Sequence, residues 1–223
     1  MSHLHIPDGV IDPIWLILGY ILTGLVIFIC INKIRKRNEE GKMALLGVMG
    51  AVMLLAMSVP LGFIPFHINL TALSGIILGP NYGFLAAFIV NLILAFLGHG
   101  GITVVGLNTL IVGSEALFGW LFYNILKRFL TRRTSAGISA LIAIIISGLL
   151  VICVISITNL EPEMVFHLHE GHSLSDNLHQ HSNSIYAFAL TVSPIILLGG
   201  AIEALITSLI VSYIRKVKPD ILK

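Results

Sequence analysis

Histidine is the residue type in this chain that is best suited to chemistry, and the sequence contains 9 of them. His3 and His5 stand in the opening MSHLHIPDGV, before the first apolar run. The others are His67, His99 and five within the segment HLHEGHSLSDNLHQHSNS, namely His167, His169, His172, His179 and His181. Imidazole nitrogen is the commonest protein ligand for borderline transition metals. The residue types therefore favour a divalent metal site, against the plainer alternative that polar residues merely fill loops.

Motifs of catalysis are missing from the sequence. His169-Glu170-Gly171-His172 is one residue too short for the H-E-x-x-H pair that zinc proteases present on one helix face. There is no G-x-x-x-x-G-K-[ST] phosphate loop and no G-x-S-x-G nucleophile elbow. We therefore expect a protein that is not an enzyme, and that takes any energy for pumping from a partner or from an ion gradient.

Two acids, Glu115 and Glu203, lie within long apolar runs. A carboxylate inside a membrane costs much free energy and usually has a partner or a function. Proton-coupled transport would use such groups. Hydrogen bonding between helices, or a place near a cytoplasmic partner surface, explains them equally well, and the sequence leaves these interpretations open.

The elements that must position these residues are membrane helices. Hydrophobic residues make up 57% of the 223-residue chain and charged residues 11%, with a mean hydropathy of +0.98. Soluble domains carry roughly a quarter charged residues, so the missing charge predicts an integral membrane protein. The net charge of +2 is too small to suggest a nucleic-acid partner.

The apolar runs predict an all-α membrane protein with seven transmembrane helices in a single domain, residues 1–223. Spans that could cross alone are residues 14–31, 43–64, 107–125, 138–157 and 185–214. The stretch 68–97 carries Gly79-Pro80-Asn81-Tyr82-Gly83 at its centre. Because proline removes a helix hydrogen bond and asparagine and glycine favour turns, we expect two short spans there, a helical hairpin.

The cationic residues decide the expected topology. All 13 Lys and Arg residues fall in three clusters, residues 33–42, 127–133 and 215–223. With seven spans these clusters share one side, which the positive-inside rule identifies as the cytoplasm. The N-terminus is then outside, the C-terminus is cytoplasmic, and all 9 histidines lie on the outer side. A metal importer would place its imidazoles in this way.

Residues 1–12 form a predicted outer N-terminal metal-binding segment. Pro7 favours an extended conformation for Ile6, and Asp8-Gly9 is a turn pair. The segment can therefore fold back over the mouth of the bundle, whereas a frayed terminus is the plainer alternative.

Three further regions on the outer side are candidates for metal handling. His67 follows the second span, and His99, in a Gly-His-Gly-Gly loop, is followed by Asn108. The glycines permit close backbone approach, or only a tight turn. The outer His-rich loop, residues 161–184, lacks the fixed spacing of a structural metal site. Candidates for a second shell or an entrance are His99, Asn108, His167, His169 and His172.

Several motifs match those of one known family. They are His5-Ile6-Pro7-Asp8-Gly9, His67, the Leu78-Gly79-Pro80 break, GHGGITVVGLNTL, and residues 194–212 with Gly199, Glu203, Ala204 and Thr207. Together they resemble the CbiM/NikM family, the cobalt- and nickel-specific substrate-binding (S) components of energy-coupling factor transporters. The resemblance covers essentially the whole chain apart from the His-rich loop.

The resemblance implies a multi-pass protein of a prokaryotic cell membrane that binds Co²⁺ or Ni²⁺, its transported substrate, in its outer half. The family's ligands are the free amine, the amide and imidazole of the following residue, and a histidine after the second helix. They correspond here to His5, His67 and the amine that begins the chain. Four coplanar nitrogens suit Ni²⁺ and, with distortion, Co²⁺, so the choice of ion stays open. The amide must lose its proton to bind, so affinity should fall in acid.

The start of the chain departs from the family pattern, because Met1-Ser2-His3 precedes Leu4, where the family's first residue belongs. Three arrangements remain. Translation starts at Leu4, which restores the motif and is the hypothesis we favour. Alternatively, Met1 is removed and Ser2-His3 repeats the arrangement of amine and histidine, with His67 as the fourth ligand. In the third, Met1 stays, and the amine, two amides and His3 close the plane without His67.

The resemblance also implies partners: a T component, two ATP-binding cassette ATPases and, as an optional part, a small accessory membrane subunit. The S component would capture metal outside, and the partners would drive its release inward. Gly47 and Ala51 form a small-xxx-small pair for a partner helix, or for ordinary packing within the chain. The rival hypothesis is a self-sufficient secondary transporter or channel for divalent metal, driven through Glu115 or Glu203.

Overall fold

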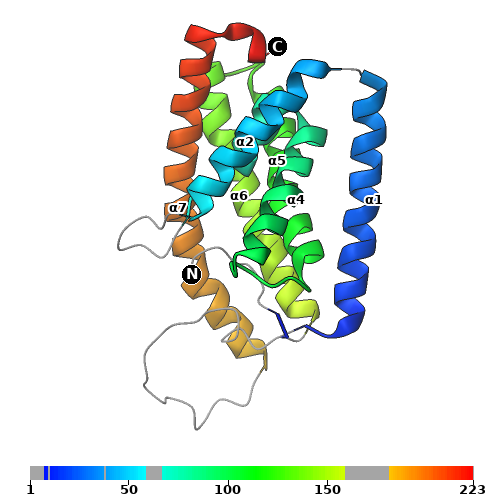
Figure 1. Cartoon of the computed structure of the whole chain (residues 1–223). Helices are drawn as coiled ribbons and strands as arrows, with labels where there is room; N and C mark the ends of the chain where they lie inside the picture. Colours follow the sequence, from blue (N-terminus) through cyan, green and yellow to red (C-terminus); the bar gives the residue numbers. More distant parts are fainter. Residues whose placement is uncertain (1–7, 10, 38, 59–66, 159–180, 223) are drawn as a thin grey trace.

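Helices account for nearly all of the chain that the computed structural model describes, namely residues 8–9, 11–37, 39–58, 67–158 and 181–222 (Figure 1). The helices are α1 (Pro13–Arg37), α2 (Glu40–Ser58), α3 (Thr71–Leu78), α4 (Pro80–Phe96), α5 (Val105–Leu126), α6 (Arg132–Ile157) and α7 (His181–Val217), followed by a 3₁₀ turn, Pro219–Leu222. The prediction of an all-α protein with seven helices is confirmed for the described residues.

The outer surface of the bundle is apolar, and many polar side chains lie inside. Large hydrophobic side chains such as Ile14, Leu55 and Leu205 are exposed, whereas Asn69 and Glu203 are buried. Such a surface fits a hydrocarbon solvent, in which every backbone polar group must be satisfied within the protein. Helices long and apolar enough to cross a membrane are α1, residues 41–58 of α2, α5, α6 and residues 192–217 of α7.

The break in the middle of the 68–97 stretch is confirmed, but one half is shorter than expected. Gly79 adopts a positive φ of 90°, and Pro80 opens α4. α3 has 8 residues, which at 1.5 Å per residue is about 12 Å, far short of the ~30 Å hydrocarbon core. α3 alone is therefore too short to cross, because residues 67–70 before it are largely buried non-helical chain held by side-chain hydrogen bonds, and the crossing of this half stays a prediction.

α3 is the central element of the bundle. All of its residues are buried, and it contacts α2, α4, α5, α6 and α7. The approach to α5 is so close that a Cβ added at Gly75 would lie 2.1 Å from the carbonyl oxygen of Ala116. Glycine is therefore required at this position, and the short helix has a fixed place against α5.

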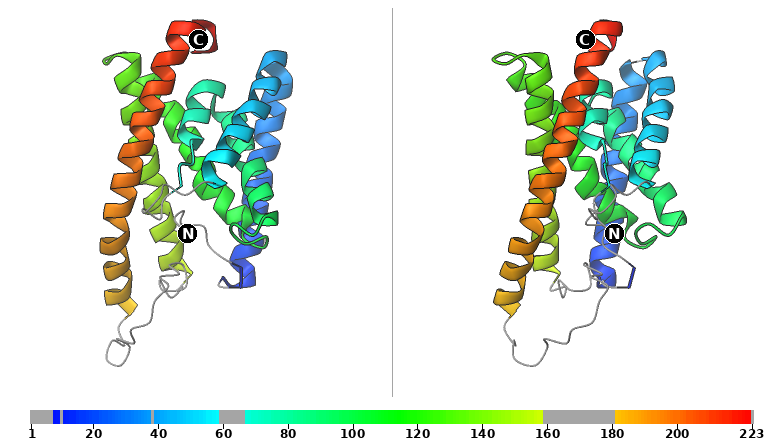
Figure 2. Two further views of the ribbon diagram at one scale, coloured as in Figure 1. Left: turned by 60° about the vertical axis from the view of Figure 1, so that its left-hand side comes forward. Right: turned by 90° about the vertical axis from the view of Figure 1, so that its left-hand side faces the viewer.

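The chain runs back and forth between two ends of the bundle. α6 and α7 lie side by side, and α1 stands at the opposite edge against α4 and α5 (Figures 1 and 2). The C-terminal end of α1, the α5–α6 connection and the C-terminus lie at one end (Figure 1). That end carries Arg35, Lys36 and Arg37 of α1 and Arg215 and Lys216 of α7. The shared end is the one that the charge pattern predicts to be cytoplasmic.

Candidate metal site

His67 is the predicted ligand that the structure places inside the bundle. Its side chain is 7% exposed, at the start of the non-helical segment 67–70 that leads into α3. The ring of His99, from the α4–α5 connection, approaches with a centroid distance of 6.3 Å and an interplanar angle of 89°. Two histidines that are far apart in sequence therefore meet, as expected if His99 lies at the entrance.

The environment of His67 favours its neutral imidazole. Burial, followed by the charge of His99, holds the pKa of His67 below its ordinary value of 6.5. A neutral imidazole has a nitrogen lone pair that a metal ion can take, whereas an imidazolium has none. His67 therefore stays neutral, the form that can bind a metal ion, to a lower pH than a solvated histidine would.

Two buried acids fix the segment that carries His67. Glu203 of α7 accepts hydrogen bonds from the backbone N–H of Asn69, at 3.2 Å to Oε2, and of Leu70, at 3.0 Å to Oε1. The Asn69 side-chain amide donates to Oε2 of Glu115 in α5 at 2.6 Å. Both acids therefore hold the loop after His67. Hydrogen bonding between helices was one of the open interpretations of these two acids. The structure shows that they hydrogen-bond to the non-helical segment 67–70, a partner that the sequence around either acid does not predict.

Asn69 is a site residue that the sequence analysis missed. Its Oδ1 accepts the backbone N–H of Thr71, the first residue of α3, and its Nδ2 reaches Glu115. A usable signal exists in the sequence, because two unpaired acids in apolar runs require donors and Asn69 is a polar residue beside His67. The local sequence does not predict which donor hydrogen-bonds to which acid.

The N-terminal segment is anchored at Asp8. The Asp8 carboxylate accepts the backbone N–H of Ile102 at 2.9 Å, and both the backbone N–H, at 2.8 Å, and the hydroxyl of Thr103. Burial acts to raise the pKa of Asp8, but these hydrogen bonds, with one from the Val104 backbone, lower it below its ordinary value. The hydroxyl of Tyr20 donates to the carbonyl of Ile102 and ties α1 to the same loop. The anchor joins the end of the predicted metal-binding segment to the loop that also carries His99.

Several predicted site residues lie outside the described part of the chain. These are Ser2, His3, Leu4 and His5 of the N-terminal segment and His167, His169 and His172 of the His-rich loop. Asn108 is described and is buried near the start of α5. Within the described ranges, no three His, Cys, Asp or Glu residues gather into a metal-ligating group. The described His, Cys, Asp and Glu side chains alone therefore do not form a metal site around His67.

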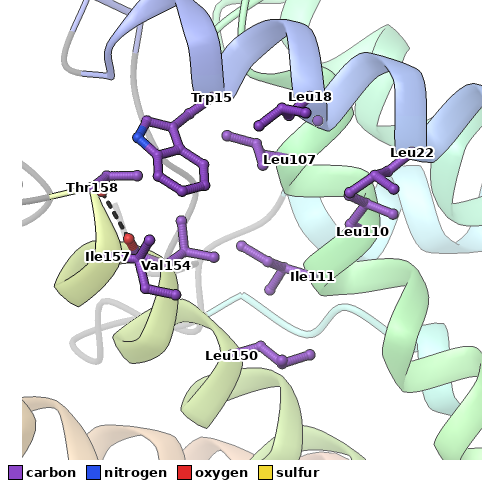
Figure 3. Close-up of a pocket in the computed structure, with 11 residues that line it drawn as sticks. Trp15, Leu18, Leu22, Leu107, Leu110, Ile111, Leu150, Val154, Ile157 and Thr158 are labelled. Atoms are coloured by element: carbon purple, nitrogen blue, oxygen red, sulfur yellow. Dashed lines mark hydrogen bonds between the residues drawn. The ribbon is translucent and has the colours of Figure 1, made fainter.

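An apolar cavity between α1, α5 and α6 is distinct from this site. It has a volume of about 270 Å³ and is lined by Trp15, Leu107, Ile111, Leu150 and Val154, among others (Figure 3). The hydroxyl of Thr158, at its edge, donates to the carbonyl of Val154 at 2.7 Å. Carbon side chains offer no metal ligands, so this cavity is not a metal site.

The fold and the site together define a class, multi-pass helical membrane proteins with an imidazole held inside the bundle. The family follows from sequence comparison. Residues 5–221 match CbiM, described as the cobalt uptake substrate-specific transmembrane region. The chain belongs to this family. Its family is one of transmembrane components of prokaryotic cobalt uptake, so it is a transport component and not an enzyme.

Individual relatives agree with this placement. The cobalt transport protein CbiM of Clostridium tetani is 35% identical over 119 residues, 49% of this chain and 48% of that protein. A protein of Archaeoglobus fulgidus named as a fused nickel transport protein, NikMN, is 27% identical over 99% of this chain and 68% of its own length. A crystal structure described as a transition metal transporter has the same fold, with a TM-score of 0.77 at 22% identity over 97% of this chain and 94% of that one.

Proposed function

We propose that this chain is the substrate-binding membrane subunit of an ATP-driven importer of Co²⁺ or Ni²⁺, of the energy-coupling factor type. The observation that carries the proposal is His67: an imidazole that is buried, kept neutral, faced by His99 and mounted on a segment held by two acids. Membership of a cobalt uptake family supports the identity of the ion. The anchored Asp8 supports a role for the residues before it.

The proposed ligand set combines His67 with nitrogen donors of the N-terminal segment. Under the favoured arrangement these are the amine at Leu4 and the amide and imidazole nitrogens of His5. The second arrangement uses the Ser2 amine and the His3 nitrogens with His67, whereas the third, which keeps Met1, uses the amine, two amides and His3 without His67 and is therefore excluded if His67 is required. All of them give four nitrogens in a plane, a geometry that Ni²⁺ and Cu²⁺ prefer and that Co²⁺ accepts with distortion. Intact-mass measurement of the native protein separates them, because a mass that includes Met1-Ser2-His3 excludes a start at Leu4.

The proposed topology puts this site outside. The N-terminus is extracellular, and the basic end of the bundle, with Arg35–Arg37 and Arg215, faces the cytoplasm. The His-rich loop, residues 161–184, would then lie at the entrance and collect divalent ions. Cysteine labelling from outside intact cells tests this: a residue introduced at Gly98 should react with a membrane-impermeant reagent, and one at Phe129 should not.

Energy is proposed to come from partners, a T component and two ATP-binding cassette ATPases, with a small accessory membrane subunit as an optional part. α2 supports this. Gly47 and Ala51 are exposed on its outer face, and a Cβ added at Gly47 would meet nothing within 4 Å. The described part of the chain therefore does not pack against Gly47, and this open position supports close approach of a partner helix.

The decisive experiment measures metal in the purified chain. Protein purified in detergent from cells grown with Ni²⁺ or Co²⁺ should retain about one ion per chain, and His67→Ala should lose it. His99→Ala serves as the matched control, because it removes an exposed imidazole beside the site and should keep most of the metal. Unchanged metal stoichiometry in His67→Ala would falsify the assignment. Uptake into liposomes by the chain alone, without ATPases, would favour the stand-alone transporter instead.

A further inference from the structure

We propose that Glu203 and Glu115 are positioning residues that set the metal affinity of His67 by fixing the chain two and three residues beyond it. This inference rests on the proposed function, because it names the support of the proposed ligand. Both acids are almost fully buried, with exposed fractions of 1% for Glu203 and 4% for Glu115. No described Lys or Arg pairs with either, since the described salt bridge joins Lys42 to Glu39. The hydrogen-bond partners that the structure gives these two buried acids are the loop and, for Glu115 alone, the hydroxyl of Ser147 in α6.

Glu203 holds the backbone itself. Its two carboxylate oxygens accept two successive N–H groups, those of Asn69 and Leu70. Leu70 adopts a left-handed conformation with φ 59°, which is uncommon for a residue other than glycine. A strained residue of this kind persists only where its surroundings enforce it, and the paired hydrogen bonds to Glu203 are such an enforcement. The carboxylate therefore determines the path of the chain directly after His67.

Glu115 holds the same loop through a side chain. Asn69 donates to Glu115 in α5 and accepts from the first N–H of α3. The one residue thus joins α5 to the start of α3, while its backbone joins α7. Contacts on three elements leave the loop no freedom to shift without breaking a buried hydrogen bond, and such a break leaves a costly unpaired group.

The consequence concerns the ligand. A buried imidazole on a fixed backbone is already ordered before the ion binds. Less binding free energy is therefore spent on immobilising the ligand, and the affinity is higher. Groups that orient ligands in this way typically change metal affinity 10- to 100-fold when they are replaced. We expect the same of Glu203, whose amide isostere would turn an N–H donor toward one of the two backbone donors.

The test compares Glu203→Gln with Val211→Ala in the full-length protein purified without metal. Val211 is fully buried on the same helix, two turns further along, and makes none of the described hydrogen bonds to the loop. Titration with Ni²⁺ should give a Kd roughly tenfold or more higher for Glu203→Gln and within about twofold of wild type for Val211→Ala. The absorption spectrum of bound Ni²⁺ should shift only in the Glu203 variant, because it reports ligand geometry and not fold stability.

The inference is overturned if Glu203→Gln keeps wild-type affinity and spectrum, or if Val211→Ala loses as much affinity. Should Glu203→Gln fail to fold, Glu115→Gln and Asn69→Ala test the same support, and wild-type affinity in both overturns it. Failure of the proposed function is recognised separately, because the wild-type protein would then bind no Ni²⁺ or Co²⁺. If wild type binds Ni²⁺, His67→Ala does not, and replacing Glu203 or Glu115 has no effect on affinity, then the proposed function stands and only the positioning role of the two acids is excluded.

Discussion

Asp8 and Thr103 are joined by two hydrogen bonds across 95 residues of sequence, one from the backbone N–H and one from the hydroxyl of Thr103. A third hydrogen bond to the Asp8 carboxylate comes from the backbone N–H of Ile102. The pair connects the N-terminal segment to the α4–α5 connection, whose His99 faces His67. The end of the chain that is proposed to deliver nitrogen donors is therefore tied to the loop beside the buried imidazole.

Asp8→Ala should weaken metal binding because the N-terminal donors then have to be ordered from a free segment. We expect the Kd for Ni²⁺, measured by titration of the purified protein, to rise about tenfold, in the range typical for groups that orient ligands. The thermal midpoint of the metal-free protein should change little, because Asp8 is exposed. Asp12→Ala is the control, since no contact of that side chain with the 101–103 loop is described. Equal Ni²⁺ affinity in Asp8→Ala and Asp12→Ala would contradict the proposal that the Asp8 anchor orders the N-terminal donors.

Gly101→Ala should disturb the same anchor from the opposite side. An added Cβ would lie 2.1 Å from Oδ1 and 2.6 Å from the backbone nitrogen of Asp8, which no real contact tolerates. We expect lower metal affinity together with a lower thermal midpoint. Gly24→Ala, in α1, meets nothing within 4 Å and should leave both unchanged or slightly improve stability. Wild-type metal affinity in Gly101→Ala would show that the 101–103 loop can move enough to accept the added Cβ without disturbing the Asp8 anchor.

The stability of the metal-free protein should fall in mild acid through His67. The folded-state pKa of His67 lies below the ordinary 6.5, so the unfolded chain binds this proton first as the pH drops. Stability therefore declines below about pH 6.5, down to the folded-state pKa, and is unaffected above that window. Thermal melts between pH 8 and pH 5 should show a smaller decline for His67→Gln than for wild type. The same decline in both proteins would assign the effect to other groups.

The Asp8 carboxylate should be insensitive to pH over that range. Its pKa is held below the ordinary value of 3.8, so its carboxylate stays ionised and its hydrogen bonds persist until the pH falls below about 4. The factor by which metal affinity falls between pH 7 and pH 5 should then be the same in Asp8→Asn as in wild type, even if the two proteins differ in affinity at pH 7. A steeper loss in wild type alone would show that the anchor titrates in this range.

Gly47→Leu should separate metal binding from transport. The residue is exposed on α2 with open space around it, so a larger side chain should leave fold and metal affinity intact while it blocks close approach of a partner helix. ATP-dependent uptake, measured in vesicles that contain the chain with its proposed T component and ATPases, should fall severalfold. Gly24→Leu, on α1 and equally open, should transport normally. Normal uptake by Gly47→Leu would move the partner surface elsewhere.

Much of this molecule follows from composition and local pattern. The apolar runs and the Gly79-Pro80 break predict the helices, because hydrophobicity and backbone chemistry act over a few residues at a time. The clustering of Lys and Arg predicts which ends of the helices lie together, and the observed arrangement of α1, α5, α6 and α7 agrees. The family motifs, including His67, are also readable from the sequence alone.

Pairings at long range were decided only by the tertiary structure. Glu203 lies 134 residues from Asn69, and Glu115 lies 46 residues from it. No periodicity along the chain encodes such contacts, which arise when α3, a helix too short to cross the bilayer, lodges between its neighbours. The physical reason is the cost of a buried polar group: it demands a partner, but the identity of that partner depends on which elements the folded bundle brings together.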